Sequence, residues 1–343
     1  MEVVGILLLA TAFAAASPFL AARRRLIDGH NARFDAGLEN YRMVLNKFSS
    51  MTKEQLRQFT GELIDGSNAD ADSPRGIIDD LDGEIPPPSA DYRNLSSPIR
   101  DQDTCGACYA FASAAALEVH LRLKKGVFDE VSEQDILDCS TATHGNRGCY
   151  GGNTMKVFRY INENGFVTKR DRYPYENKLG RCRSQREHAA GTVDGFELVY
   201  GGRDTKEHRM KVVIGLDGPV TVMLQYLPES FYEYDGGIYD DTKCGQIDAE
   251  NPLAHAVTVV GYGSEEGKDY WIIRNSWGTK WGEEGYARLA FGKNVCGLTT
   301  KVVLPVATVF KQKFLHLSDP ILNGVVQECD IHQKSQIPGW ISQ

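Results

Sequence analysis

The order of the hydrophobic patterns along the central block constrains the fold of this chain most strongly. Residues 107–125 are rich in Ala and Leu and stop at Gly126, which predicts a helix with a glycine at its end. Ser132, followed by acidic residues, predicts the start of another helix. Strands separated by Gly turns are expected later, at 220–224, 256–262, 270–274 and 286–290. Helices first and strands afterwards predict an α+β protein with two segregated lobes.

The segments around this block have a different character. Residues 26–64 are polar with apolar side chains at three- and four-residue spacing, which predicts helix. Residues 65–90 carry Gly, Ser, Asp and Pro and are expected to form an exposed linker that proteases cut easily. A weakly patterned tail follows Pro305.

The N-terminus indicates export. Residues 3–16 are almost wholly apolar, and the alanines at 14–16 offer a cleavage site before Ser17. This run is too short to span a bilayer comfortably, so stable membrane insertion is not expected. Glu2 stands where a basic residue is usual, which leaves an uncleaved anchor or a wrongly assigned start as alternatives.

Charge narrows the range of partners. The formal net charge is −8 and the pI about 5.6. Nucleic acids and anionic membranes need a basic face, so neither is expected as the main partner.

The chain has eight cysteines, and their spacing does not suggest a metal site. Cys105 and Cys108 form a single CxxC pair without a second ligand pair at zinc spacing. Disulfides together with at least one free thiol are expected instead, which requires an oxidising compartment. Asn94 lies in an N-glycosylation sequon and is a glycosylation candidate.

Cys108 is the candidate nucleophile. It should lie in the first turn of the Ala-rich helix, where free N–H groups and the helix dipole stabilise a thiolate. The alternative is a small buried apolar residue, as most free cysteines are.

A cysteine nucleophile needs a base that a third group orients. His255 begins one predicted strand, and Asn275 follows the next. The amide of Asn275 could fix the imidazole tautomer, with Trp277 shielding that bond from water. The alternative for His255 is a satisfied core histidine.

These segments resemble papain and the cathepsins, most closely the cathepsin L-like branch. Residues 105–109 (CGACY) meet the family pattern around the catalytic cysteine, and His255 follows Cys108 by 147 residues (255 − 108), within the family's range. The other matching segments are 131–139 (VSEQDILDC), 148–152 (GCYGG) and 275–286 (NSWGTKWGEEGY).

The resemblance implies a cysteine endopeptidase with the papain-like two-lobe fold and a cleft between a helical lobe (about 100–195) and a β-barrel-like lobe (about 196–305). Cys108 and His255 would form a thiolate–imidazolium pair, Asn275 would orient the histidine, and Gln102 would donate to the oxyanion. No metal or cofactor is expected. The implied disulfides leave Cys108 and Cys329 unpaired and are Cys105–Cys149, Cys139–Cys182 and Cys244–Cys296.

The same resemblance predicts the substrate-binding residues. Gly151 and Gly152 would pair with an extended substrate backbone, and Trp277 would line the site. The family's specificity pocket, which holds the second residue before the scissile bond, would be lined by Asn153, Thr154, Met223, Leu253, Ala256 and Lys301. Lys301 stands at the floor of this usually apolar pocket, so a preference for Glu or Asp is one hypothesis. The other is that Lys301 turns outward and the pocket takes Leu or Phe.

The resemblance also divides the chain. A signal peptide at 1–16, an abbreviated inhibitory propeptide at 17–86, a peptidase domain at 87–305 and a C-terminal extension at 306–343 are expected, with maturation between Asp82 and Ser89. The expected partners are protein and peptide substrates, the chain's own propeptide and cystatin-like inhibitors. A monomer in the secretory pathway, lysosomal or extracellular, is expected. The alternatives are a catalytically silent binding protein and a peptide ligase that uses the same acyl-enzyme.

Overall fold

The computed structural model describes residues 18–63, 76–78, 81, 83–141, 144–199, 206–246 and 253–308, and within these ranges the side chains of Pro18, Ile77 and Leu253 are not described. These residues belong to one compact unit. The predicted signal peptide, most of the predicted C-terminal extension and Cys329 lie outside the described residues.

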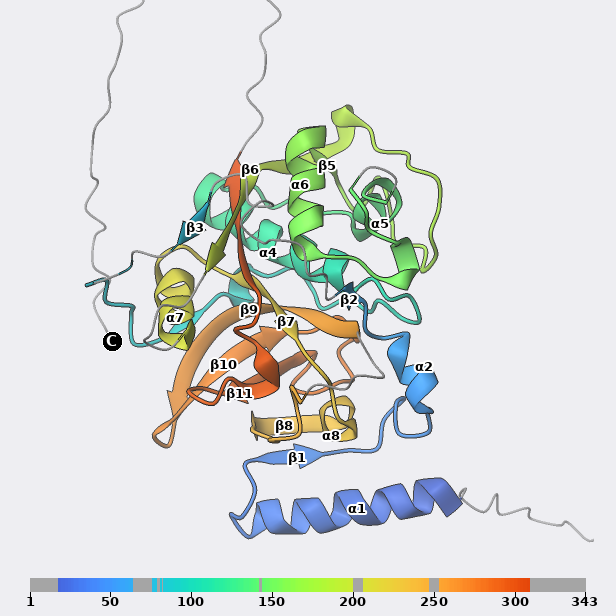
Figure 1. Cartoon of the computed structure of the whole chain (residues 1–343), viewed down its shortest axis with the longest axis vertical. Coiled ribbons are helices and arrows are strands. Elements are labelled where there is room, and N and C mark those ends of the chain that lie inside the picture. The colour runs from blue at the N-terminus through green and yellow to red at the C-terminus, as the bar shows by residue number, and fades with distance from the viewer. Residues whose placement is uncertain are drawn as a thin grey trace, which may run out of the picture. The chain divides into compact units, whose positions relative to one another are not determined.

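The N-terminal part runs along the bottom and side of the molecule in Figure 1 before the two lobes begin. Its elements are α1 Pro18–Asp35, β1 Tyr41–Met43, α2 Lys53–Arg57, β2 Glu62–Leu63, β3 Ile77–Ile78 and β4 Ala90–Asp91.

The helical lobe lies at the top of Figure 1. Its elements are α4 Cys108–Lys125, α5 Glu133–Cys139, α6 Thr154–Asn164 and β5 Val167–Thr168. Helix α4 ends where the sequence predicts, because Gly126 adopts φ 64°, a left-handed conformation that glycine accepts readily. Ser132 caps α5 by accepting a hydrogen bond from the N–H of Asp135.

A twelve-stranded sheet carries the rest of the fold. Its further strands are β6 Ala189–Val199, β7 Val220–Leu224, β8 Tyr234–Tyr239, β9 Leu253–Glu265, β10 Lys268–Arg274, β11 Tyr286–Ala290 and β12 Val302–Thr308. The remaining helices are α7 Lys206–Leu216 and α8 Glu229–Tyr232, with the 3-10 turns η1 Arg93–Leu95, η2 Gly148–Tyr150, η3 Arg186–His188 and η4 Val295–Gly297. The strand order is β1-β8-β11-β10-β9-β7-β12-β6-β3, with β2 and β4 also on β9 and β5 on β6. The four predicted strands are therefore confirmed.

Two hydrophobic cores give the molecule its two lobes, as the α+β prediction requires. One core packs α4, α5 and α6 together, and the other lies among the strands from β7 to β11. Strand β6 crosses the predicted lobe boundary, since Phe196 and Leu198 are buried in the helical core.

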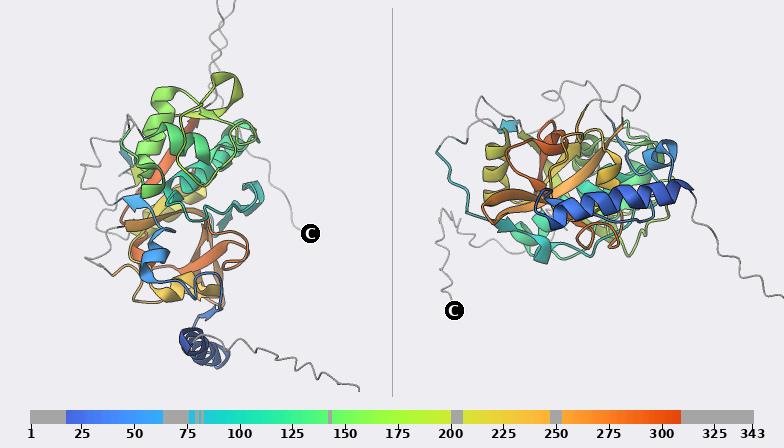
Figure 2. Two further views of the ribbon diagram at one scale, coloured as in Figure 1. Left: turned by 90° about the vertical axis from the view of Figure 1, so that its right-hand side faces the viewer. Right: turned by 90° about the horizontal axis from the view of Figure 1, so that it is seen from below.

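The N-terminal segment completes the β-lobe core. Tyr41, Phe48, Leu56 and Phe59 are buried in this core together with strand residues. Phe48 makes a ring contact with Trp277 at a centroid distance of 5.0 Å. From α1 the N-terminal segment runs past α2 to β2, which lies at the level where the two lobes meet (Figure 2).

The prediction that residues 26–64 are helical is wrong beyond Asp35, except in α2. Helix α1 ends at Asp35, and Gly37 follows with φ 73°. Asn46 then holds a turn, because its side chain accepts from the N–H of Phe48 and donates to the carbonyl of Tyr232. The apolar residues in this stretch are spaced as they are because they are buried against the β lobe. Their spacing does not mark one face of a helix.

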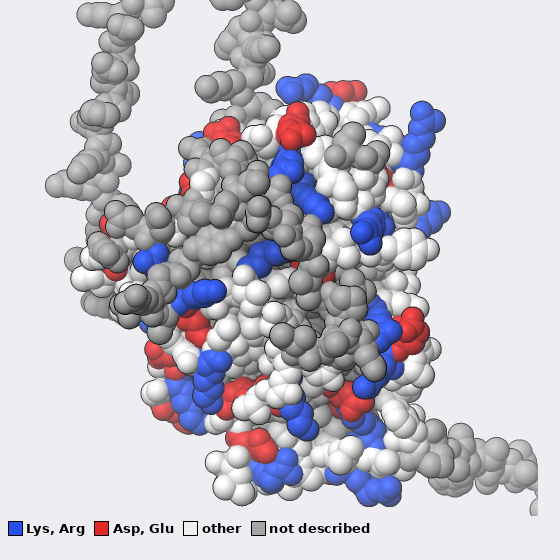
Figure 3. Space-filling view, in the orientation of Figure 1, with Lys and Arg blue, Asp and Glu red and all other residues white. Residues whose placement is uncertain are grey.

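Charges of both signs are interspersed on the face shown in Figure 3. Among the residues that the structure describes, no helix combines the length and apolar character needed to cross a membrane.

Candidate active site

Cys108 is the first residue of α4 and is fully buried. Its Sγ accepts a hydrogen bond from the N–H of Ala256 at 3.4 Å, which brings the helix N-terminus against β9. Burial, together with the charge of Glu62, raises the pKa of Cys108 to about 12, although N–H groups of Ala256, Tyr109 and Gly61 oppose the rise. In this state the group is a thiol at neutral pH, and a thiol is a poor nucleophile.

His255 lies on β9 and is held there by one hydrogen bond and one aromatic ring contact. Its Nε2 lies 2.8 Å from Oδ1 of Asn275, and its ring stacks on Trp277 with centroids 4.6 Å apart. The same Oδ1 accepts from the backbone N–H of Ser276, which can only donate. The orientation of the amide is therefore fixed, and Nε2 must carry the proton that it donates to Asn275.

This tautomer leaves Nδ1 of His255 as the basic nitrogen. Nδ1 has no hydrogen-bond partner among the described residues. Burial lowers the pKa of His255 to about 4, although the bond to Asn275 works in the opposite direction. The histidine is thus neutral in this buried state, and its unprotonated Nδ1 is the nitrogen that can accept a proton.

Gln102 is buried beside the loop that leads into α4. Its Nε2 donates to the carbonyl oxygen of Cys105 at 2.9 Å and lies 3.4 Å from that of Phe59. Its Oε1 accepts from the hydroxyl of Ser276 at 2.6 Å. Ser276 therefore links Gln102 to the segment that carries Asn275, a contact that the sequence did not reveal.

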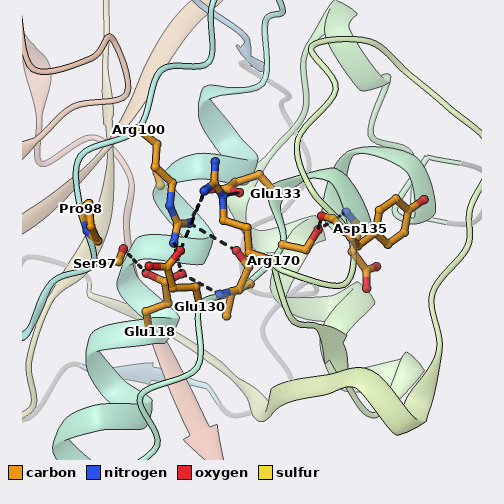
Figure 4. Close-up of polar contacts among 12 residues, drawn as sticks. Ser97, Pro98, Arg100, Glu118, Glu130, Glu133, Asp135 and Arg170 are labelled. Carbon is orange, nitrogen blue, oxygen red and sulfur yellow. Dashed lines mark hydrogen bonds and ion pairs between the residues drawn. The ribbon is translucent and has the colours of Figure 1, made fainter.

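A buried charge cluster holds the chain just before Gln102 (Figure 4). Arg100 forms ion pairs with Glu118 at 2.8 Å, with Glu130 at 2.9 Å and with Glu133. Glu118 comes from α4 and Glu133 from α5, so the cluster ties the loop of Gln102 to both helices. The carboxylates compensate the buried guanidinium, which ties the loop to both helices, and Arg170 supplies a second cation to Glu133 at 3.2 Å.

The N-terminal segment passes through the predicted substrate-binding residues. The N–H of Gly61 donates to the carbonyl of Ala254 at 3.0 Å. Gly152 donates to the carbonyl of Gly61, and Leu63 donates to that of Gly152, both at 2.7 Å. Residues 61–63 thus form an extended strand between Gly152 and β9, where the sequence places the substrate backbone.

Glu62 projects into the predicted specificity pocket. Its Oε1 lies 3.0 Å from Nζ of Lys301 and 3.4 Å from the N–H of Thr154. Met223 and Ala256 are partners in the β7–β9 register, and Met223 donates to the carbonyl of Lys301. Five of the predicted pocket residues are buried or half-buried here, namely Asn153, Thr154, Met223, Ala256 and Lys301. The side chain of Leu253 lies outside the described residues.

Trp277 lies between the N-terminal segment and His255. Its indole N–H donates to the carbonyl of Phe59 at 3.2 Å, and its ring packs on His255. Phe59, Gly61 and Glu62 were missed by sequence reasoning, since their contacts join positions some 200 residues apart in the chain. The one available signal was Lys301, a cation that calls for an acidic partner.

The structure joins Cys105 to Cys149, Cys139 to Cys182 and Cys244 to Cys296, the pairs that the resemblance implies. Cys108 is the free cysteine of the described residues. Asn94 is exposed within η1. The described part of the chain contains no group of three or more His, Cys, Asp or Glu side chains arranged to hold a metal ion.

Comparison with known proteins points in one direction. The family profile described as "Papain family cysteine protease" matches residues 86–306. Cathepsin L of Sarcophaga peregrina is 37% identical, over 82% of this chain and 83% of that protein. Cathepsin K of Mus musculus is 35% identical, over 81% and 82% respectively.

Solved structures of precursors are also similar. A digestive procathepsin L 3 from the larval midgut of Tenebrio molitor superposes with a TM-score of 0.72 at 32% identity, covering 84% of this chain and 90% of that one. A recombinant stem bromelain precursor gives a TM-score of 0.71 at 31% identity, covering 84% and 89%.

Proposed function

Because this chain belongs to the papain family of cysteine proteases and is a cysteine endopeptidase made as a zymogen, we propose that Cys108 is its nucleophile and His255 its base. The observation that carries the proposal is the hydrogen bond between His255 Nε2 and Asn275 Oδ1, at 2.8 Å. It leaves Nδ1 free to take the thiol proton. The N–H of Ala256, next to His255, already contacts Sγ of Cys108 at 3.4 Å.

The reaction follows from these positions. Nδ1 of His255 takes the proton of Cys108, and the thiolate attacks the carbonyl carbon of the scissile peptide bond. Gln102 Nε2 and the backbone N–H of Cys108 donate to the oxygen that becomes negative. The protonated His255 then gives its proton to the leaving amine, and a water that His255 deprotonates releases the acid from the thioester. Asn275 keeps the histidine in one tautomer throughout.

The segment 17–86 acts as the propeptide and inhibits the enzyme by occupying the site of the substrate backbone. Residues 61–63 take the hydrogen bonds of Gly152 and Ala254 that a substrate backbone needs. Phe59 places its carbonyl against Gln102 and Trp277. The covered Cys108 and His255 remain neutral because burial disfavours both charges. Removal of the propeptide readmits water and makes the charged pair accessible.

The remaining assignments rest on the same family membership. A signal peptide at 1–16 and three disulfides fit the secretory pathway, with a lysosomal or extracellular destination. The peptidase domain comprises 87–305, the extension 306–343, and maturation occurs between Asp82 and Ser89. The partners are protein and peptide substrates and cystatin-like inhibitors, and the enzyme is a monomer.

The test is hydrolysis of an internally quenched peptide library by the acid-activated protein, beside a Cys108→Ala variant. The wild type should cleave internal peptide bonds. The rate of cleavage by the variant should be lower by a factor of about a thousand or more. Circular dichroism of both proteins controls for folding. A wild type with intact disulfides that cleaves none of the peptides would contradict the proposal.

A further inference from the structure

A buried ion pair lies at the end of the strand that the propeptide inserts. The side chain of Glu62 is 1% exposed and that of Lys301 14%, and their charged atoms are 3.0 Å apart. The N–H of Thr154, the first residue of α6, also faces the carboxylate at 3.4 Å. A cation and a helix N-terminus therefore converge on one oxygen. These groups around Glu62 are called the Lys301 site below.

The Lys301 site belongs to the active site rather than to a distant surface. Glu62 pairs with Ala254, the residue before His255, and with Gly152. Its charge is close enough to Cys108 to contribute to the raised pKa of that thiol. An extended peptide held by Gly152 and β9 would direct one of its side chains into the same place.

The energetics of the Lys301 site change when the propeptide leaves. A largely buried ammonium group is costly unless an anion or several hydrogen bonds compensate it. A leucine side chain in this place would leave Lys301 unpaired or force it outward to solvent. A glutamate side chain would restore the contacts that Glu62 makes, with a carboxylate at the same reach. The shorter aspartate would not reach Nζ equally well.

We infer that the Lys301 site is a carboxylate-selective specificity pocket that takes glutamate at the second residue before the scissile bond, and that Glu62 is its internal mimic. This inference rests on the proposed function, since it assigns a substrate class to the same active site. Lys301 is its specificity-determining residue, and Thr154 contributes a backbone donor that any side chain at position 154 except proline would keep.

The experiment compares fluorogenic peptides that differ only in Glu, Gln or Leu at that residue, using the activated full chain. A charge-assisted hydrogen bond predicts a kcat/KM for Glu about tenfold to a hundredfold above that for the isosteric Gln. In Lys301→Met the ratio of Glu to Gln should fall to about one, and Lys301→Arg should preserve it. Since Lys301→Met removes the cation that compensates Glu62 in the precursor, the double variant Glu62→Gln/Lys301→Met provides the same mature site from a precursor without that carboxylate charge.

The outcomes separate this inference from the proposed function. An active-site-directed epoxide that labels Cys108, together with hydrolysis of the Leu peptide, establishes the enzyme independently of the pocket. If that activity is present but Glu is cleaved no faster than Gln, or the ratio survives Lys301→Met, the inference is overturned and the function stands. If neither labelling nor hydrolysis occurs with any peptide, the proposed function itself fails.

Discussion

Gly61 of the propeptide lies against the backbone of Gly106, in the loop that leads into α4. A Cβ added to Gly61 would lie 2.1 Å from the carbonyl oxygen of Gly106 and 2.6 Å from its carbon. Both are backbone atoms beside a disulfide-bonded cysteine, so they have little freedom to move. Gly61→Ala must therefore lift the propeptide strand. This displaces its three hydrogen bonds with Ala254 and Gly152, worth about 1 kcal/mol each.

A loss of about 3 kcal/mol raises the open fraction of the precursor about a hundredfold. The assay is the rate at which an epoxide peptide labels Cys108 in the intact precursor, with only full-length chains counted by mass spectrometry. Gly29→Ala is the matched control, because nothing lies within 4 Å of the Cβ it would add in α1. Gly61→Ala should be labelled about a hundredfold faster than the wild type, and Gly29→Ala at the wild-type rate. Equal rates for all three proteins would refute the idea that this strand closes the site.

Three further predictions concern the catalytic groups and the buried histidines. Gln102→Ala should lower kcat about a hundredfold to a thousandfold with a smaller effect on KM, because the variant lacks one donor to the oxyanion. Steady-state kinetics on the Leu peptide measure both constants. A decrease in kcat of less than tenfold would contradict the role of Gln102. Asn275→Ala removes the acceptor of His255 Nε2–H and should reduce kcat/KM about tenfold to a hundredfold, whereas unchanged kinetics would show that the tautomer is fixed otherwise. Burial lowers the pKa of both His120 and His255 to about 4, so the unfolded chain binds more protons between pH 6.5 and 4. The precursor's free energy of unfolding should therefore fall by about 2–3 kcal/mol per histidine as pH drops through that window; urea titrations at pH 7 and 4.5 test this, and His120→Gln should remove half of the slope.

Local signals were sufficient for much of the peptidase domain. Gly126 ended α4 because a left-handed residue satisfies the last carbonyls of a helix, and Ser132 capped α5 through its own hydroxyl. Two of the proposed catalytic residues were also accessible, since they lie at the boundary of an element: Cys108 opens α4 and Asn275 follows β10. Such boundaries leave marks in the sequence that do not depend on distant partners.

The conformation of the propeptide and its contacts with the β lobe could not be predicted in the same way. Phe48 and Tyr41 have helical spacing in the sequence, but the surface that buries them is the β lobe, formed some 200 residues later. The pairing of Glu62 with Lys301 spans 239 residues and has no local signature. Lys301 alone suggested an acid-binding pocket as one of two hypotheses, and only the fold supplies the acidic residue that fills it.

The proposed mechanism depends most directly on the identity of the reactive thiol and its base. The measurement is labelling of the acid-activated chain by an epoxide peptide at pH 5–7, followed by peptide mapping of every cysteine, in the wild type and in His255→Ala. The proposed mechanism predicts one adduct per chain, on Cys108, formed much more slowly without His255 and with the three disulfides intact in both proteins. An adduct on another cysteine, or a rate on Cys108 that is indifferent to the loss of His255, would contradict it.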